Sequence, residues 1–268
     1  MVNNIDYHII DRCNLNCASC NHFSSLVPST DKGKSIEQIT SDLTLLSKVK
    51  EGFNCLTILG GEPTLHPELS KILRIARQIY PNKQINLVTN GTNYDKFEKW
   101  RDSIIENNIH VILSLYPYCD DNMERAEKIR KILEPYNSFR VEGTANEDGF
   151  NYGFLSNMDN VATEDDIIHC VRPFWCAQVK NGKLYICNFA AQFDRFKAFF
   201  GDKITFELDG KEYLDLNGDV TVKDFYNFID YARPNICYHC VDCVKKNASG
   251  PRHHWTTTKK DINEWIVE

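Results

Sequence analysis

Short apolar runs alternate with amphipathic segments through the first half of the chain, and this alternation constrains the fold more than any other feature. Each run is rich in Ile, Leu and Val and has the length of a strand that is buried on both faces. We place these strands at residues 5–10, 55–59, 85–89 and 111–115, with a fifth at 139–141. Helices are predicted between them at residues 36–46, 69–79, 94–104 and 123–133.

Repeated βα units build a parallel sheet, so the predicted fold class is α/β. The sheet is either open or curled towards a barrel, and in both cases ligands bind where the strands end and the loops begin. From about residue 146, Gly, Asn and Asp become frequent and helices are expected to be scarce, while the Asn181-Gly182 turn predicts a hairpin ahead of a strand at 183–187. We therefore divide the chain into a core domain at residues 1–145 and a small appended domain at 146–268.

The composition argues against several classes of protein. The 268-residue chain carries a net charge of −6 and lacks a clustered basic stripe, so we expect no nucleic-acid partner. No apolar stretch reaches about 18 residues and the first residues do not resemble a secretory leader, so we expect a cytoplasmic protein with no membrane partner. Eleven cysteines in a reducing compartment predict metal ligation rather than disulfides.

Cys13, Cys17 and Cys20 follow the first predicted strand directly, with three and two residues between them. Three thiolates on one loop suit a cubane iron-sulfur cluster, and they leave one iron open to bind a substrate or cofactor. The alternative is a zinc site, for which His22 is the candidate fourth ligand.

A second motif follows the second predicted strand: Gly60-Gly61-Glu62-Pro63. Together with the three cysteines, it resembles the radical S-adenosylmethionine (SAM) superfamily over residues 5–145. The resemblance implies a partial (βα)6 TIM-like barrel with a small C-terminal auxiliary-cluster domain. It further implies a [4Fe-4S] cluster on the three cysteines and a loop of Gly60, Gly61 and Glu62 that receives the amino group of the SAM methionine. Two glycines permit close backbone approach, and a carboxylate accepts from an ammonium.

Asn90 and Ser114 end the third and fourth predicted strands, where the family places contacts to the cofactor ribose or the substrate. A simple strand-ending turn explains them equally well. Ser19 precedes the third cysteine, a position at which the family commonly has an aromatic residue. We therefore expect packing on the adenine side to come from elsewhere, for example from Phe23.

A second group of cysteines lies in the appended domain. Its members are Cys170, Cys176, Cys187, Cys237, Cys240 and Cys243. Cys170, Gly182 and Cys187 are spaced as in the opening motif of the Twitch and SPASM extensions of radical SAM enzymes, and six cysteines fit the shorter Twitch form. We assign one auxiliary [4Fe-4S] cluster, the second in the chain. Its proposed ligands are Cys170, Cys187, Cys237 and Cys240, with Cys176 or Cys243 as alternates and a zinc knuckle as the alternative kind of site.

The resemblance implies reductive cleavage of SAM to a 5′-deoxyadenosyl radical, which takes a hydrogen atom from the substrate. The length and layout are similar to those of radical dehydrogenases that act on aminocyclitols such as 2-deoxy-scyllo-inosamine. We therefore expect an oxidoreductase with a small-molecule substrate of the sugar or cyclitol class, and an electron donor such as flavodoxin or ferredoxin. His22, Tyr116, Arg172 and His239 are candidate bases by position only.

Two other functions stay open. A peptide-modifying radical enzyme would epimerise or crosslink its substrate, and Cys119 is a candidate hydrogen-atom donor for epimerisation. A non-catalytic protein would carry a cluster for electron transfer or use zinc for stability. The Gly60-Gly61-Glu62-Pro63 loop argues against this last function, since a carrier does not need an amine-binding site beside an open iron.

Overall fold

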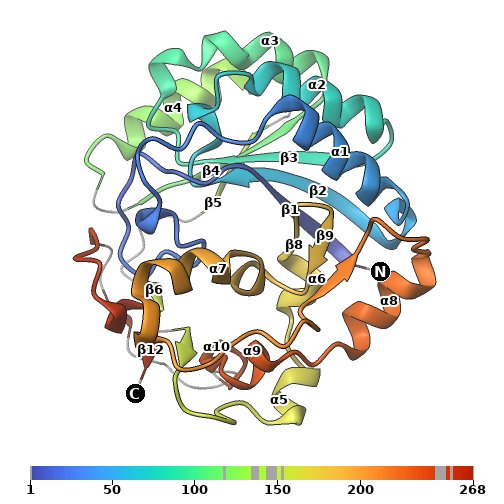
Figure 1. The fold of residues 1–268 in the computed structure, drawn as a ribbon. Helices are drawn as coiled ribbons and strands as arrows, with labels where there is room; N and C mark the ends of the chain where they lie inside the picture. The colour runs from blue at the N-terminus through green and yellow to red at the C-terminus, as the bar shows by residue number, and fades with distance from the viewer. Residues whose placement is uncertain are drawn as a thin grey trace.

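A mixed sheet of eight strands runs through the molecule in the order β10-β9-β8-β1-β2-β3-β4-β5 (Figure 1). The computed structural model describes residues 2–116, 119–133, 139–142, 150–151, 154–244, 252–253 and 256–267. The six neighbouring strands from β8 to β5 are parallel. This arrangement confirms the predicted α/β fold with a partial (βα)6 barrel.

The first five strands lie where the apolar runs predicted them. They are β1 (Val2–Ile10), β2 (Phe53–Gly60), β3 (Gln84–Thr89), β4 (His110–Ser114) and β5 (Phe139–Glu142). Residues from neighbouring strands pair in register, as Leu87 does with Val111. Because the strands are parallel, their carboxyl ends meet at one edge of the sheet, and the loops that follow β1 to β4 meet there too.

Four helices cover one face of this sheet (Figure 1). They are α1 (Ile36–Ser47), α2 (Leu69–Ile79), α3 (Glu98–Glu106) and α4 (Asn122–Leu133). Ser35 caps α1 by accepting the backbone N–H of Gln38, at 3.2 Å. The predicted helix at 94–104 is divided into the 3-10 turn η4 (Tyr94–Lys96) and α3. Helix existence was thus predicted correctly, while this boundary was not.

The sixth parallel strand comes from the C-terminal part of the chain. Strand β8 (Ala177–Lys180) pairs with β1, and β9 (Lys183–Tyr185) and β10 (Tyr213–Asp215) continue the sheet with antiparallel pairing. Asn181 and Gly182 join β8 to β9, and both have a positive φ, of 54° and 71°. Such a turn matches the twist of a hairpin, as predicted. The sheet therefore crosses the division drawn at residue 145.

The expectation of few helices after residue 146 is wrong. This region contains α5 (Glu164–Ile168), α6 (Arg172–Trp175), α7 (Asn188–Phe200), α8 (Val222–Tyr231), α9 (Asn235–Tyr238) and α10 (Val241–Val244). Helix α7 lies on the opposite side of the sheet from α1 to α4 (Figure 1). Its first six residues are all buried, so the first half of the helix lacks the polar face by which an amphipathic helix is recognised in a sequence.

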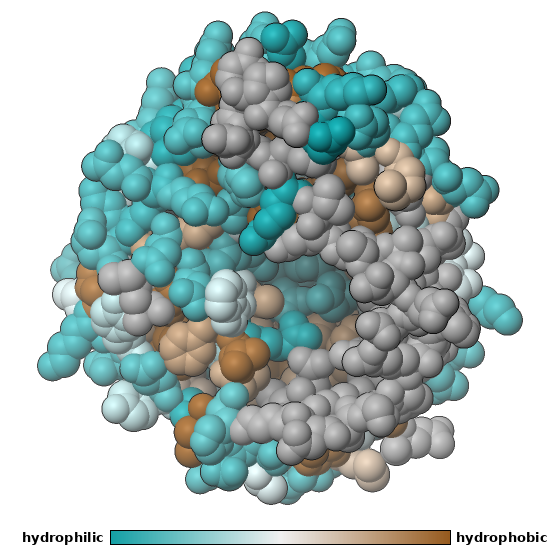
Figure 2. Space-filling model, turned by 180° about the vertical axis from the view of Figure 1, so that it is seen from behind, coloured by the Kyte–Doolittle hydropathy of each residue, from teal (hydrophilic) through white to brown (hydrophobic). Residues whose placement is uncertain are grey.

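Two short strand pairs complete the C-terminal region. Strand β6 (Phe150–Asn151) pairs with β11 (Arg252–His253), and β7 (Leu155–Ser156) pairs with β12 (Ile266–Val267). The face in Figure 2 is largely hydrophilic among the coloured residues and is hollowed near its centre. Within the described parts of the chain, every helix falls short of the length and apolarity needed to cross a bilayer.

Candidate functional site

A pocket of about 270 Å³ opens at the carboxyl ends of β1 to β4. Ten residues singled out in the sequence line it together: Cys13, Cys17, Cys20, His22, Gly60, Gly61, Glu62, Asn90, Ser114 and Tyr116. Cys13, Gly60, Asn90 and Ser114 each end a strand or lie within three residues of its end. We call this cavity the first pocket.

The cysteine loop leaves β1 and is held by a side chain that sequence reasoning missed. The carboxylate of Asp31 accepts the backbone N–H groups of Asp11 and Arg12, at 2.9 and 3.1 Å, just ahead of Cys13. In the sequence, Asp31 shows only the common signature of a turn residue two positions before Gly33. The sequence around Asp31 therefore did not indicate that this residue holds the cysteine loop.

The three thiols share a setting that suits a cationic metal group. Burial raises the pKa of Cys13, and Glu62 and the other two thiols raise it further. Cysteine binds metal as the thiolate, and three thiolates so close together require positive charge between them. The donor set, three soft sulfurs that line one pocket, therefore fits the cluster implied by the motif.

The two glycines are required by the contact between two loops. The N–H of Gly61 donates to the carbonyl of Ile10 at 3.0 Å, and the N–H of Glu62 donates to the carbonyl of Arg12, also at 3.0 Å. A Cβ atom on Gly60 would overlap the Ile10 carbonyl, and one on Gly61 would overlap the Arg12 carbonyl. The glycines thus let the loop after β2 lie directly against the cysteine loop.

Glu62 organises the floor of the first pocket. Its side chain is fully buried, and Oε1 accepts the N–H of Thr64 at 3.0 Å and the hydroxyl of Thr89 at 2.6 Å, while Oε2 accepts the N–H of Asn90 at 2.8 Å. Burial raises the pKa of Glu62 above its ordinary value, and these hydrogen bonds offset only part of the rise. The carboxylate therefore joins the ends of β2 and β3, with Thr89 donating one of the hydrogen bonds.

The remaining predicted residues reach the first pocket from three directions. The amide of Asn90 donates to the side-chain oxygen of Asn14, at 3.0 Å, inside the cysteine loop. The Nδ1 atom of His22 lies 2.9 Å from Nε2 of His8. Burial and the three thiols raise the pKa of Tyr116 well above its ordinary value. Asn90, His22 and Tyr116 are thus in place to touch a ligand.

Other predictions for this pocket fare differently. Phe23 does not supply adenine packing: it is fully buried in the core, where its ring stacks on Phe196 at 4.6 Å. Cys119 is partly exposed, and among the residues that the structure describes it is not part of the pocket lining. His239 is buried and stacks on Phe206 with ring centroids 3.9 Å apart. These two rings carry no contact with the first pocket in the described structure.

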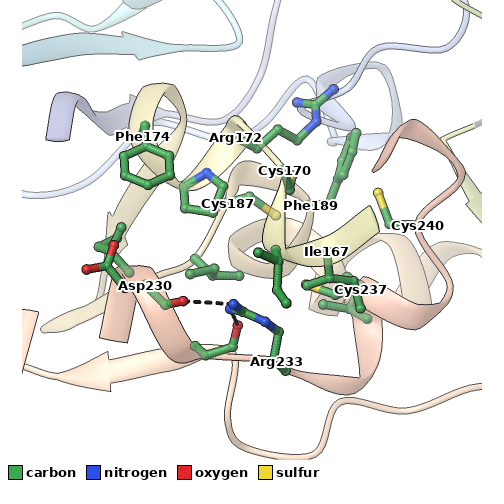
Figure 3. A pocket seen from close by; sticks show the side chains of 16 residues that line it. Ile167, Cys170, Arg172, Phe174, Cys187, Phe189, Asp230, Arg233, Cys237 and Cys240 are labelled. Atoms are coloured by element: carbon green, nitrogen blue, oxygen red, sulfur yellow. Dashed lines mark hydrogen bonds between the residues drawn. The ribbon is translucent and has the colours of Figure 1, made fainter. Parts of the chain in front are cut away.

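A second pocket, of about 90 Å³, lies among α5 to α9 (Figure 3). All four proposed auxiliary ligands line it: Cys170, Cys187, Cys237 and Cys240. A cavity of roughly 10–15 Å³ holds one water, so this one has room for a group of several atoms. The hairpin and the turn at α9 bring together cysteines that are 70 positions apart in sequence, from 170 to 240.

The surroundings of the second pocket match a thiolate site. Burial raises the pKa of Cys187 to about 12, with Cys240 adding to the effect and Arg172 opposing it. Arg172 lines the pocket, and its guanidinium lies 4.4 Å from the centre of the Phe189 ring (Figure 3). A nearby cation stabilises thiolates, which are the form that binds metal.

The two alternate ligands are placed differently. Cys176 caps the end of α6 and is outside the second-pocket lining, while the side chain of Cys243 lies outside the described residues. In the described part of the chain, no three His, Cys, Asp or Glu side chains converge as the ligands of a single metal ion do.

Comparison with known proteins identifies the family to which this chain belongs. Residues 7–154, more than half of the chain, match the radical SAM superfamily. The chain belongs to the radical SAM superfamily. It is therefore a radical SAM enzyme, and membership implies a [4Fe-4S] cluster and SAM as cofactors.

Curated radical SAM relatives match over the core only. An S-adenosylmethionine-dependent nucleotide dehydratase from Flammeovirga pacifica is 29% identical over 112 residues, which are 41% of this chain and 36% of the relative. Molybdenum cofactor biosynthesis protein 1 from Bos taurus is 33% identical over 129 residues, 47% of this chain and 20% of the relative. The chain thus spans well under half of the length of these relatives.

The solved structure of BtrN in complex with AdoMet and 2-DOIA matches nearly the whole radical SAM chain. It covers 96% of this chain and 99% of BtrN, with a TM-score of 0.52 and 14% identity. BtrN in an open conformation gives a TM-score of 0.50 with 15% identity and 95% coverage of both chains. The shared fold therefore extends beyond the core into the region of the second pocket.

Proposed function

We propose that this radical SAM enzyme oxidises a small-molecule substrate of the sugar or cyclitol class, assisted by an auxiliary [4Fe-4S] cluster. The observation that carries the proposal is the second pocket, in which Cys170, Cys187, Cys237 and Cys240 surround one cavity. A radical SAM enzyme that only abstracts a hydrogen atom needs no second thiolate site. One that completes a two-electron oxidation needs an electron acceptor, and a four-cysteine cluster supplies one.

In the first pocket, Cys13, Cys17 and Cys20 are the proposed cluster ligands. Gly60, Gly61, Glu62, Asn90 and Ser114 are the proposed SAM-binding residues. When bound, the cluster and SAM supply a 5′-deoxyadenosyl radical that abstracts a hydrogen atom. The chain would hold the reactants in the first pocket, where Glu62 fixes the position of Asn90 by accepting its backbone N–H at 2.8 Å.

The proposed oxidation balances as follows. Conversion of a secondary alcohol to a ketone removes one hydrogen atom, one further electron and one proton from the substrate. The hydrogen atom leaves with 5′-deoxyadenosine, the electron passes to the auxiliary site, and the proton passes to a base. His22 lines the first pocket and is the candidate for that proton. Tyr116 lines the same pocket, but its raised pKa keeps the phenol protonated, and Arg172 lines the second pocket.

Anaerobic reconstitution tests this proposal directly. We expect about eight iron and eight sulfide ions per chain, since each [4Fe-4S] cluster contains four of each. A variant with Cys187→Ala and Cys240→Ala is expected to retain one cluster and SAM cleavage but to lose product formation. A Cys13→Ala variant is expected to lose SAM cleavage. Zinc in place of iron in the second pocket would exclude the oxidative assignment.

Substrate class is tested with deuterium. Reduction with dithionite, flavodoxin or ferredoxin in the presence of deuterated sugars, cyclitols, nucleotides or peptides should transfer label to 5′-deoxyadenosine from the true substrate. Label from a sugar or cyclitol supports the proposal. Label from a peptide would assign epimerase or crosslinking chemistry instead, and failure of every preparation to form 5′-deoxyadenosine would leave a non-catalytic cluster or zinc protein.

A further inference from the structure

The C-terminal segment at residues 256–267 lies against the cysteine loop of the first pocket, about 240 positions away in sequence. The N–H of Ala18 donates to the carbonyl of Thr256 at 2.9 Å, and the N–H of Thr258 donates to the carbonyl of Asn16 at 2.8 Å. Cys17 forms an isolated antiparallel bridge with Thr257. The segment therefore pairs with the loop as a short strand would.

Ser19 of the cysteine loop forms side-chain and backbone hydrogen bonds with the C-terminal segment. It is fully buried and has a φ of 53°, a left-handed conformation that residues other than glycine seldom adopt. Its hydroxyl donates to the carbonyl of Glu264 at 2.6 Å, and its N–H donates to Glu264 Oε2 at 3.2 Å. Both hydrogen-bond donors of this strained residue are thus satisfied by one residue of the C-terminal turn.

The buried carboxylate of Glu264 accepts hydrogen bonds from both the C-terminal segment and the cysteine loop. Its side chain is only 3% exposed, and Oε1 accepts the N–H of Lys259 at 2.9 Å while Oε2 accepts that of Ser19. It closes the 3-10 turn η7 (Ile262–Glu264), whose N-cap is Asp261. The carboxylate therefore stabilises the C-terminal turn by an internal hydrogen bond and also joins this turn to the cysteine loop.

Trp265 makes the next contact along the loop. Its indole N–H donates to the carbonyl of Cys20 at 2.9 Å, and its fully buried ring packs near Phe196 and Phe200. Its own carbonyl accepts the N–H groups of Phe154 and Leu155, at 2.8 and 3.1 Å. Trp265 thus connects the third cysteine of the motif to the segment that contains β7.

That segment is bonded to the cysteine turn of the second pocket. The N–H of Val241 donates to the carbonyl of Phe154 at 2.9 Å, and the N–H of Ser156 donates to the carbonyl of His239 at 2.8 Å. Cys240 forms a bridge with Leu155. A set of hydrogen bonds therefore runs from Cys20 through Trp265 and β7 to His239 and Val241, the residues on either side of Cys240.

We propose that Glu264 and Trp265 are positioning residues that hold the cysteine loop in its metal-binding form and couple it to the second cysteine site. The inference rests on the proposed function in one respect, that Cys13, Cys17 and Cys20 hold the SAM-binding cluster. Glu264 acts on Ser19, and Trp265 acts on Cys20. Without them, the loop has more conformations available and presents its thiolates less often in the geometry that retains iron and binds SAM.

The test compares two Trp→Phe variants in the reconstituted full-length protein. Trp265→Phe keeps most of the ring but removes the hydrogen bond to Cys20. Trp100→Phe is the matched control, because Trp100 is 3% exposed and its indole nitrogen has no hydrogen-bond partner in the described structure. The readouts are the SAM-dependent change in the EPR signal, titrated to give a Kd, and the rate at which an iron chelator removes that signal.

For Trp265→Phe we expect at least fivefold weaker SAM binding and at least fivefold faster loss of the SAM-responsive signal. Trp100→Phe should stay within twofold of the unaltered protein in both. Glu264→Gln, with the exposed Glu51→Gln as its control, covers the case in which Trp265→Phe does not fold, and about threefold changes are expected. Thermal melts identify loss of stability, which alone would not alter the Kd of molecules that remain folded.

The outcomes separate this inference from the proposed function. If Trp265→Phe and Glu264→Gln match their controls in both SAM affinity and chelation rate, the positioning role is excluded while the proposed function stands. If the unaltered protein forms no SAM-responsive signal, the assignment of the three cysteines fails and this inference falls with it.

Discussion

The side-chain amide of Asn188 donates a hydrogen bond of 2.7 Å to the carbonyl oxygen of Asn21. Asn188 directly follows Cys187 of the second pocket, and Asn21 directly follows Cys20 of the first. Arg172 donates to the other end of the Asn188 side chain, at 3.2 Å. One amide therefore links the two cysteine-lined pockets at a different point from the C-terminal turn.

Replacement of this amide should weaken the link. Asn188→Ala removes the hydrogen bond to the Asn21 carbonyl and the one from the Arg172 guanidinium in a largely buried setting. We expect a loss of about 2 kcal/mol in the free energy of unfolding, seen as a fall of roughly 4–8 °C in Tm. Product formed per 5′-deoxyadenosine should fall as well, because the electron acceptor is no longer held in fixed relation to the first pocket.

Gln38→Ala, which removes an exposed amide contact to Asn181, should change Tm little. An Asn188→Ala protein with unchanged Tm and product ratio would contradict the link.

Loss of the Glu62 charge should act on SAM binding. Glu62→Gln keeps the size of the side chain, but an amide cannot accept at both ends the hydrogen bonds from Thr89 and Asn90. We expect SAM binding to weaken at least tenfold, about 1.4 kcal/mol, while the iron content is retained. Isothermal titration under anaerobic conditions gives the Kd. Glu68→Gln at an exposed site is the control, and equal SAM affinity in the two variants would exclude this role of Glu62.

Gly61 should tolerate no side chain. In Gly61→Ala the new Cβ overlaps the Arg12 carbonyl, so the loop after β2 must move away from the cysteine loop. We expect a loss of about 3 kcal/mol in stability together with incomplete cluster loading. Gly218→Ala is the matched control, because a Cβ at Gly218 meets nothing within 4 Å, and it should stay within about 0.5 kcal/mol. Similar melts and iron contents for the two variants would show that the close loop contact is not required.

We expect the buried carboxyl group of Asp6 to lower the free energy of unfolding as pH rises. Burial raises the pKa of Asp6 from 3.8 to about 7, opposed by the amide of Asn4 and the charge of Arg172. Between these two values the folded protein keeps a proton that the unfolded chain has lost, so stability declines from about pH 4 to pH 7 and the decline is complete above pH 7. Asp6→Asn does not titrate, so its stability relative to the unaltered protein should rise across this window, by up to about 4 kcal/mol.

Melts at pH 5, 6, 7 and 8 check this, with the exposed Asp202→Asn as control. A difference between Asp6→Asn and the unaltered protein that is constant with pH would show that Asp6 is ionised throughout.

The first pocket was largely predictable because its parts lie on consecutive βα units. Cys13, Gly60, Asn90 and Ser114 each follow or end a predicted strand, and parallel strands bring their carboxyl ends together. The four cysteines assigned to the second site, through the hairpin at Gly182 and the spacing of Cys237 and Cys240, line one cavity. Their role as cluster ligands is a proposal that iron counts will test.

What could not be predicted depends on contacts between distant parts of the chain. The sequence alone determined the first five strands, the four helices between them, the hairpin at Asn181-Gly182, the two cysteine groups and the glycine-rich loop, because spacing and periodicity along a short stretch encode them. Only the tertiary structure decided that β8 joins β1, that Phe23 belongs to the core, and that Glu264 and Trp265 hold the cysteine loop. Such contacts come from packing and hydrogen bonding between segments up to 245 positions apart in sequence. The pattern of residues within one segment does not indicate which distant segment it will contact.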